Sequence, residues 1–239
     1  MISGFFNESI IKRAIDKKIV DLEIINLRDF AKDKYKSVDD KPYGGGVGMV
    51  LKPDILFDAI KKAKKDNDKT KIILTSPKGK IFDQKKAKEY SNLDHLILIA
   101  GHYEGADDRI KNFIDEEISI GDFILTGGEI PASCIVDSIV RLIPGVLKKQ
   151  EASKNESFFE IDVGEVEKII GKNETINSLK KRNIKKIKLL EYPQYTRPKK
   201  FLNLKVPEVL LSGDHKKIRE WRLKKAFKKT LKKRPDLLK

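Results

Sequence analysis

The fold is decided by the stretch His95-Leu-Ile-Leu-Ile-Ala-Gly-His-Tyr-Glu-Gly105. Its apolar run, residues 95–100, is long enough for a strand buried on both faces and too short for a helix. A glycine turn follows immediately. Glycine adopts left-handed backbone angles and lets a ligand approach the peptide groups. Because ligands of open α/β sheets bind beyond the carboxyl ends of the strands, this turn is a candidate binding site.

A second glycine turn, one strand and one helix later, repeats the arrangement. It reads Gly121-Asp-Phe-Ile-Leu-Thr-Gly-Gly-Glu-Ile-Pro131. The pattern predicts a strand over residues 123–125, a turn at Gly127-Gly128 and a helix that begins around residues 129–131. The alternative is that both are structural βα turns, as in any α/β protein. We favour a cofactor pocket because the turns are close in the chain and each has an acidic residue beside its glycine.

Strands and helices alternate outward from these turns. Further strands are predicted over residues 20–27 and 71–74, and helices over residues 9–17, 54–64, 83–90 and 107–114. This alternation predicts an α/β fold, with a mostly parallel sheet and helices on both of its faces.

A third turn, Thr75-Ser-Pro-Lys-Gly79, ends the strand over residues 71–74. We expect the three turns to converge on one ligand.

The glycine-rich loop over residues 38–49 does not carry a known phosphate-binding motif. It contains four glycines within five positions, but the GxGxxG register fails at Met49. No GxxxxGK[ST] sequence occurs anywhere in the chain. Binding of nucleotide phosphates therefore lacks its usual signature.

Composition indicates a protein of a reducing compartment. The chain has 239 residues and one cysteine, Cys134, which excludes an internal disulfide and is interpreted as a small buried hydrophobic residue. No apolar run approaches the length of a membrane span, and the first residues lack a signal-peptide pattern. We therefore expect a cytoplasmic protein without a membrane partner.

Positive charge is concentrated near the C-terminal end. The net charge is +15, and residues 199–239 contain fifteen Lys or Arg against four Asp or Glu. A polyanion is the expected partner, although a generally lysine-rich composition is the alternative for scattered lysines. A basic helix is predicted from the cap near Ser212 to about residue 233, with apolar side chains that face a core. Those side chains are Ile218, Trp221, Leu223, Phe227 and Leu231.

Seven segments resemble, in the right order, the bacterial tRNA (guanine-N(1)-)-methyltransferases of the trefoil-knot (SPOUT) superfamily. They are VDDKPYGGGVGMVLKP (38–53), LTSPKGK (74–80), GHYEGADDRI (101–110), SIGDFILTGGEIPA (119–132), RLIPGVL (141–147), LLEYPQYTRP (189–198) and LLSGDHKKIREWR (210–222). The resemblance covers nearly the whole chain. It implies transfer of a methyl group from S-adenosyl-L-methionine to ring nitrogen 1 of the guanosine 3′ of the anticodon, position 37 of tRNA.

The resemblance also implies an organisation. Residues 1–150 would form a knotted α/β catalytic domain that binds S-adenosylmethionine, residues 151–190 an extended flexible linker, and residues 191–239 a small basic α-helical domain that binds tRNA. The family is a homodimer with its active site at the subunit interface. Its RNA partner is the tRNA anticodon stem-loop.

Site residues follow from the resemblance position by position. The expected cofactor-binding residues are Pro77, Gly79, Gly101, Tyr103, Glu104, Gly105, Ile120, Gly121, Asp122, Phe123, Ile124, Leu125, Gly127, Gly128 and Pro131. The expected catalytic residues are Glu156, as the base that removes the guanine proton, and Arg141, which would stabilise the guanine oxygen. The expected substrate-binding residues are Ser157, Arg197, Lys216, Arg219 and Arg222. No metal site is predicted.

Three features depart from the family pattern. Glu156 stands where the family has an aspartate, after a loop one residue shorter, so Glu151 is the alternative base. The strand that precedes, in the family, the segment beginning here at Ile2 does not occur in this sequence, so either the start codon is misplaced or the sheet lacks an element. The linker segment over residues 159–188 is much longer than the corresponding linker of the family. Two alternatives remain, a catalytically impaired RNA-binding homologue and a related knotted methyltransferase that acts on another RNA position.

Overall fold

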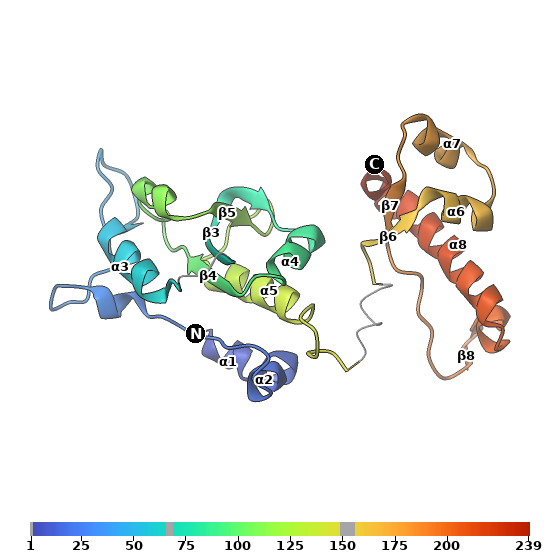
Figure 1. The fold of residues 1–239 in the computed structure, drawn as a ribbon, viewed down its shortest axis with the longest axis horizontal. Helices are drawn as coiled ribbons and strands as arrows, with labels where there is room; N and C mark the ends of the chain where they lie inside the picture. Colours follow the sequence, from blue (N-terminus) through green and yellow to red (C-terminus); the bar gives the residue numbers. More distant parts are fainter. Residues whose placement is uncertain (1, 66–68, 149–155) are drawn as a thin grey trace. The chain divides into compact units, whose positions relative to one another are not determined.

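In the computed structural model, the described residues are 2–65, 69–148 and 156–239. They belong to two compact units, Met1–Lys148 and Lys149–Lys239 (Figure 1). The first unit contains α1 (Ser3–Phe6), α2 (Ser9–Asp16), the 3-10 helix η1 (Leu27–Phe30), β1 (Asp39–Asp40), β2 (Val50–Leu51), α3 (Pro53–Ala63), β3 (Thr70–Ile81), α4 (Gln84–Tyr90), β4 (His95–Ala100), the 3-10 helix η2 (Asp108–Phe113), β5 (Glu116–Ser119) and α5 (Glu129–Val140).

A parallel three-stranded sheet in the order β4-β3-β5 forms the centre of the first unit. The predicted strand over residues 95–100 is confirmed as β4, which pairs with β3 from Thr70↔His95 to Thr75↔Ala100. The predicted helices over residues 9–17, 54–64 and 83–90 and from residue 129 are confirmed as α2, α3, α4 and α5.

Helices cover both faces of this sheet, as the alternation of elements predicts. Ile72 and Leu74 of β3 pack in one apolar cluster with residues of α3 and η2. Ile73, between them in the chain, belongs to a second cluster with residues of α4 and α5. Successive side chains of a strand point to opposite faces, so the two clusters lie on opposite sides of β3. The mixed α/β class with a parallel sheet is therefore confirmed.

Four local predictions for the first unit are wrong. Residues 20–26 form neither helix nor strand, because Val20 and Leu22 instead pack beside α2 and α5. The predicted helix over residues 107–114 is the short 3-10 helix η2. No strand forms over residues 123–125, and the strand of this region is β5, nearer the N-terminus. Cys134 is exposed, because it lies on the face of α5 away from the sheet cluster.

The predicted turn over residues 75–79 is a bulge inside β3. Thr75 and Lys80 both stand opposite Ile118 of β5, so the four residues between them have no partner in the ladder. Gly79 fits there because it has no side chain, since a Cβ atom would lie 2.4 Å from the carbonyl carbon of Glu117. The strand therefore continues past the turn.

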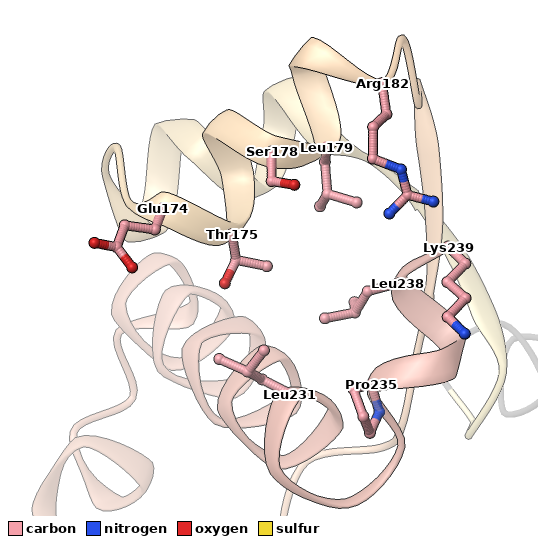
Figure 2. A pocket seen from close by; sticks show the side chains of 9 residues that line it. All are labelled: Glu174, Thr175, Ser178, Leu179, Arg182, Leu231, Pro235, Leu238 and Lys239. Carbon is pink, nitrogen blue, oxygen red and sulfur yellow. The ribbon is translucent and has the colours of Figure 1, made fainter.

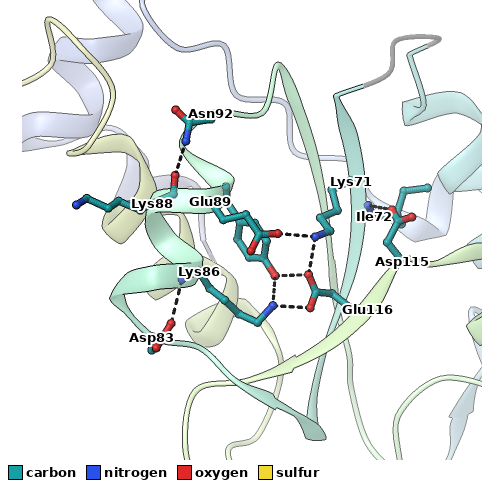
Figure 3. A network of polar contacts seen from close by, with 10 residues as sticks. Lys71, Ile72, Asp83, Lys86, Lys88, Glu89, Asn92, Asp115 and Glu116 are labelled. Carbon is teal, nitrogen blue, oxygen red and sulfur yellow. Dashed lines mark hydrogen bonds and ion pairs between the residues drawn. The ribbon is translucent and has the colours of Figure 1, made fainter. Parts of the chain in front are cut away.

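A charged network joins β3, α4 and β5 (Figure 3). The carboxylate of Glu116 contacts Lys71 Nζ at 2.9 Å and Lys86 Nζ at 2.6 Å, and the Tyr90 hydroxyl donates to it at 2.5 Å. Burial alone would raise the pKa of Glu116, but the three hydrogen bonds outweigh burial and lower that pKa to about 2. Burial and the neighbouring Glu116 together raise the pKa of Tyr90 above its usual range.

We predict that Glu116→Gln lowers the free energy of unfolding by on the order of 2 kcal/mol at pH 7, because it leaves partly buried cations without their carboxylate. The folded-state pKa lies below the unfolded value, so the stabilisation exists above about pH 4.5 and is lost as the pH falls toward 2. The difference between variant and wild type, measured by denaturant unfolding, should therefore shrink from pH 5 to pH 3. Glu89→Gln is the control, because half-exposed Glu89 contacts only Lys71 of this network. An equal effect of both variants would contradict the prediction.

The second unit is a folded α+β domain. It contains β6 (Phe159–Asp162), α6 (Val163–Ile170), α7 (Glu174–Lys181), β7 (Lys186–Leu189), β8 (Lys200–Phe201), β9 (Leu204–Lys205), the 3-10 helix η4 (Glu208–Leu211), α8 (His215–Lys233) and the 3-10 helix η5 (Pro235–Leu238). β6 and β7 pair antiparallel, from Phe159↔Leu189 to Asp162↔Lys186. The predicted basic helix is confirmed as α8.

The predicted flexible linker over residues 151–190 is wrong for residues 159–189. Its apolar side chains, which look sparse in a charged sequence, form one core with α8. Buried members of this core include Val166, Ile176, Ile187, Leu189 and Phe227. The C-terminal region is therefore not purely helical, and it begins well before residue 191. The part of the linker over residues 151–155 lies outside the described residues.

A buried threonine ties the chain after β7 to α8. Thr230 is fully buried, and its hydroxyl donates to the carbonyl of Ala226 at 2.9 Å and accepts from the N–H of Leu190 at 2.8 Å. Further along, the Tyr192 ring lies 4.7 Å from the guanidinium of Arg222. Residues 190–192 are therefore held along the helix.

We predict that Thr230→Val lowers the stability of the second unit by about 1–3 kcal/mol, because valine has nearly the same shape but leaves the Leu190 N–H without its acceptor. Hydrogen exchange followed by NMR should show faster exchange of the Leu190 amide. Thr230→Ser, which keeps the hydroxyl, is the matched control and should preserve protection of that amide. Equal protection in the valine variant would contradict the prediction.

Candidate functional site

The two glycine turns meet at the carboxyl end of β4. The N–H of Gly128 donates to the carbonyl of Gly101 at 2.7 Å, and His102 and Gly127 form a backbone bridge. Thr75 of β3 joins them, because its hydroxyl donates to the Ile99 carbonyl at 3.0 Å and accepts from the Gly101 N–H at 3.4 Å. The two glycine turns are therefore bonded to each other in the first unit.

Close packing explains why glycine is needed at this junction. A Cβ atom on Gly128 would lie 2.4 Å from the Thr75 hydroxyl and 2.5 Å from the Gly101 nitrogen. Gly105 has a φ of +103°, which is strained for residues with a side chain. The turn between Gly101 and Gly105 therefore lies directly against the start of α5.

The loop before α3 completes one side of this turn. The Glu104 N–H donates to the Met49 carbonyl at 3.1 Å, and the Leu51 N–H donates to the Gly105 carbonyl at 3.0 Å. The Glu104 side chain lies against Gly48, where an added Cβ atom would come within 2.7 Å of it. The glycine-rich loop thus contributes to the site through its last residues.

The third expected turn is connected to the second one through β5. Gly79 lies against the backbone of Glu117 and Ile118. β5 then leads into Gly121, whose N–H donates to the Ser119 hydroxyl at 3.2 Å while that hydroxyl donates to the Gly121 carbonyl at 3.0 Å. The segment with Pro77 and Gly79 is therefore adjacent to the strand before the second turn, and convergence of all three turns on one ligand stays a prediction.

Apolar side chains project from the turns. Tyr103, Phe123, Ile124 and Leu125 are exposed, and Ile124 is 79% accessible. Monomeric proteins rarely expose contiguous apolar patches without a binding role. Ile120, Asp122 and Pro131, which also belong to the expected cofactor set, lie in the segment of the second turn, between β5 and the first turn of α5.

Sequence reasoning missed a pair of side chains that joins the two turns. His102 Nε2 lies 2.6 Å from Glu129 Oε1. The acidic residue beside Gly128 was part of the pattern, but its partner lies 27 positions away in the chain. Only the meeting of the turns brings the two side chains together.

The expected catalytic residues lie in different units. Arg141 is the C-cap of α5 in the first unit. Glu156 and Ser157 precede β6 in the second unit, and the Ser157 hydroxyl accepts from the Glu191 N–H at 3.1 Å. Their cooperation in one active site stays a prediction.

The expected RNA-binding cations lie along α8 and the segment before it. Lys216 and Arg197 are exposed. Arg219 forms an ion pair with Glu165 of α6, and Arg222 lies over the Tyr192 ring. Two of the four cations therefore also have structural contacts within the second unit.

A pocket of about 370 Å³ lies between α7, α8 and η5 in the second unit. Figure 2 shows the side chains that line it. It is lined by Glu174, Thr175, Ser178, Leu179, Arg182, Leu231, Pro235, Leu238 and Lys239. None of these is an expected site residue. Leu231, which the sequence analysis places toward a core, is instead partly exposed at this pocket.

The described residues contain neither a cluster of metal ligands nor a membrane-spanning helix. Within residues 2–65, 69–148 and 156–239, no group of three or more His, Cys, Asp or Glu could hold a metal ion. Over the same part of the chain, every helix is too short or too polar to cross a lipid bilayer.

Comparison with known proteins gives the family. The family model described as tRNA (Guanine-1)-methyltransferase TrmD matches residues 1–239. The chain belongs to this family. Its membership confirms the resemblance carried by the seven segments, and the match includes both units.

Individual members of the tRNA (Guanine-1)-methyltransferase family are similar along the whole chain. The tRNA (guanine-N(1)-)-methyltransferase of Dictyoglomus turgidum is 49% identical over 238 residues, which span 100% of this chain and 85% of the relative. That of Endomicrobium trichonymphae is 46% identical over 248 residues, 100% and 95% of the two chains. That of Geobacillus kaustophilus is 47% identical over 239 residues, 100% and 87%.

Proposed function

We propose that this protein transfers a methyl group from S-adenosyl-L-methionine to ring nitrogen 1 of the guanosine 3′ of the tRNA anticodon, position 37. The observation that carries the proposal is the family match over residues 1–239, which includes every segment of the candidate site. The meeting of the two glycine turns supports it from the geometry.

The residues of the turns fit S-adenosylmethionine. An added Cβ atom at Gly105 would meet nothing within 4 Å, so a ligand can approach the backbone of the first turn closely at this position. The exposed carboxylate of Glu104 lies beside this backbone and can offset a positive charge. When bound, the cofactor supplies a methyl group activated by a sulfonium.

Two side chains carry the chemistry at the acceptor. Nitrogen 1 of guanine bears a proton and is a poor nucleophile until that proton leaves. Glu156 accepts the proton as general base, so that the nitrogen lone pair can form the new bond to carbon. Arg141 donates to the guanine oxygen, where negative charge develops as the proton is removed.

The second unit supplies affinity for the RNA. Its excess of Lys and Arg over residues 199–239 favours a polyanion, with the anticodon stem-loop as the expected partner. A guanosine in a single-stranded loop can turn out of its stack and enter a pocket. We further propose a cytoplasmic homodimer with its active site at the subunit interface, and a trefoil knot in the first unit. The exposed apolar side chains of the turns support such an interface.

An assay with purified protein, labelled S-adenosylmethionine and unmodified tRNA tests the proposal. We expect label to enter tRNA with guanosine 3′ of the anticodon, and nucleoside analysis to identify 1-methylguanosine. Matched tRNA with adenosine at that position is the control. Failure of transfer at every salt concentration would favour an impaired RNA-binding homologue. A different methylated nucleoside or position would favour a related enzyme.

A further inference from the structure

The pair formed by His102 and Glu129 joins two turns of the candidate site through side chains. A carboxylate oxygen can only accept, so His102 Nε2 carries the hydrogen and donates it across 2.6 Å to Glu129 Oε1. Both side chains are about one-third exposed, at 32% and 28%. The pair is therefore partly shielded from water and close to the surface that the turns present.

The turn that begins at His102 contains a strained residue. Tyr103 has a φ of +55°, in the left-handed region that residues with a side chain rarely adopt. Such a conformation is unfavourable and persists only where its surroundings impose it. The N–H of Gly105 donates to the His102 carbonyl at 2.8 Å and closes the turn around Tyr103.

The same pair packs over the second turn. A Cβ atom on Gly127 would lie 2.5 Å from Glu129 Oε2 and 2.8 Å from His102 Cε1. Both side chains therefore lie directly on the peptide backbone at Gly127. Together with the hydrogen bond from Gly128 to Gly101, they attach the first turn to the start of α5.

We propose that His102 and Glu129 are positioning residues, which hold the turn from Gly101 to Gly105 in the conformation that binds the cofactor. This inference rests on the proposed function, because it concerns the same site. The pair acts through the backbone of Tyr103 and Gly105. An exposed ion pair of the same kind contributes little, so the expected effect comes from fixing this strained turn.

Binding and kinetics of His102→Ala, Glu129→Ala and the double variant test the proposal. Each single variant should raise the dissociation constant for S-adenosylmethionine about tenfold, as a loss of about 1.4 kcal/mol would give. The KM for tRNA should change less than twofold. The double variant should bind the cofactor about as well as the weaker single variant, because the two residues act as one unit.

Hydrogen exchange gives a reading that does not depend on activity. In His102→Ala, the Gly105 and Gly128 amides should exchange faster, while the Ile73 and Leu74 amides of β3, which has a paired strand on each side, should keep their protection. His102→Gln places an amide N–H close to the position of Nε2 and should restore most of the cofactor affinity. Asp108→Ala is the control, because it removes an exposed ion pair with Lys111 in the same unit.

The results distinguish failure of the proposed function from failure of the positioning role. Absence of S-adenosylmethionine binding by the wild-type protein would count against the proposed function itself. Normal binding by the wild type with unchanged binding by the single variants would overturn the positioning role. Fully additive effects in the double variant, or equal losses of cofactor and tRNA binding with general loss of protection in β3, would also overturn it.

Discussion

Glu156→Gln is expected to lower kcat for methyl transfer by roughly 10²–10⁴-fold, the contribution usual for a general base. Glutamine has almost the same shape as glutamate but cannot accept the proton of guanine nitrogen 1. Binding of S-adenosylmethionine, measured by calorimetry, should stay nearly unchanged, because Glu156 is expected to act on the guanine and is not among the residues expected to hold the cofactor. The loss should therefore appear in single-turnover rates at saturating cofactor.

Glu160→Gln is the matched control for this variant. Glu160 is an exposed residue of β6, four positions further along the chain, and its charge has no expected role. It should keep wild-type turnover. Substantial activity of Glu156→Gln would remove Glu156 as the base, and Glu151→Gln would then test the alternative residue.

Gly128→Ala is expected to weaken binding of S-adenosylmethionine by more than tenfold and to destabilise the first unit by about 1–3 kcal/mol. The new methyl group would lie 2.4 Å from the Thr75 hydroxyl, 2.5 Å from the Gly101 nitrogen and 2.7 Å from the Ala100 Cα. Two of these contacts are with backbone, so no rotamer change can relieve them. The turns would have to separate.

Calorimetric titration with the cofactor and thermal unfolding measure the two effects of Gly128→Ala. Gly4→Ala is the control, because a Cβ atom at Gly4 would meet nothing within 4 Å. It should leave both quantities near their wild-type values. Unchanged cofactor affinity in Gly128→Ala would show that the meeting of the turns is not required for binding.

The sequence correctly predicted the helices and strands whose apolar residues follow a regular pattern from end to end. β4 is a continuous aliphatic run, and α3 repeats its apolar residues at helical spacing, so both were predictable. β5 was not, because it contains Glu116, whose charge is balanced by Lys71 and Lys86 from other elements. A carboxylate in a strand is acceptable only once those partners are in place.

The sequence did not predict that residues 159–189 fold as part of the second unit, and the reason is related. Between residues 159 and 189 the buried positions are few and separated by charged residues, so the segment has the composition of a linker. Ile176 and Ile187 become core residues because α8, far along the chain, covers them. The composition of residues 159–189 cannot predict that α8 packs over them.

The sequence predicted the turns of the candidate site. It did not predict the side-chain contacts that join these turns. Glycine clusters indicated where the backbone would be exposed to a ligand. The pairing of His102 with Glu129, and the position of Thr75 between two strands, depend on distances across the sheet. Arg141 and Glu156 belong to different units, so their joint action stays a prediction.

The contribution of α8 to the core changes how the electrostatics of RNA binding can be dissected. Deleting residues 199–239 would remove Leu223, Ala226 and Phe227 together with the lysines, so weaker affinity would report collapse of the domain. Neutralising one exposed lysine of the helix at a time avoids this. Each lysine that binds a phosphate should, once neutralised, reduce the slope of log affinity against log salt concentration by about one. The helix is at once part of the core and a polyelectrolyte, and only the second role can be removed residue by residue.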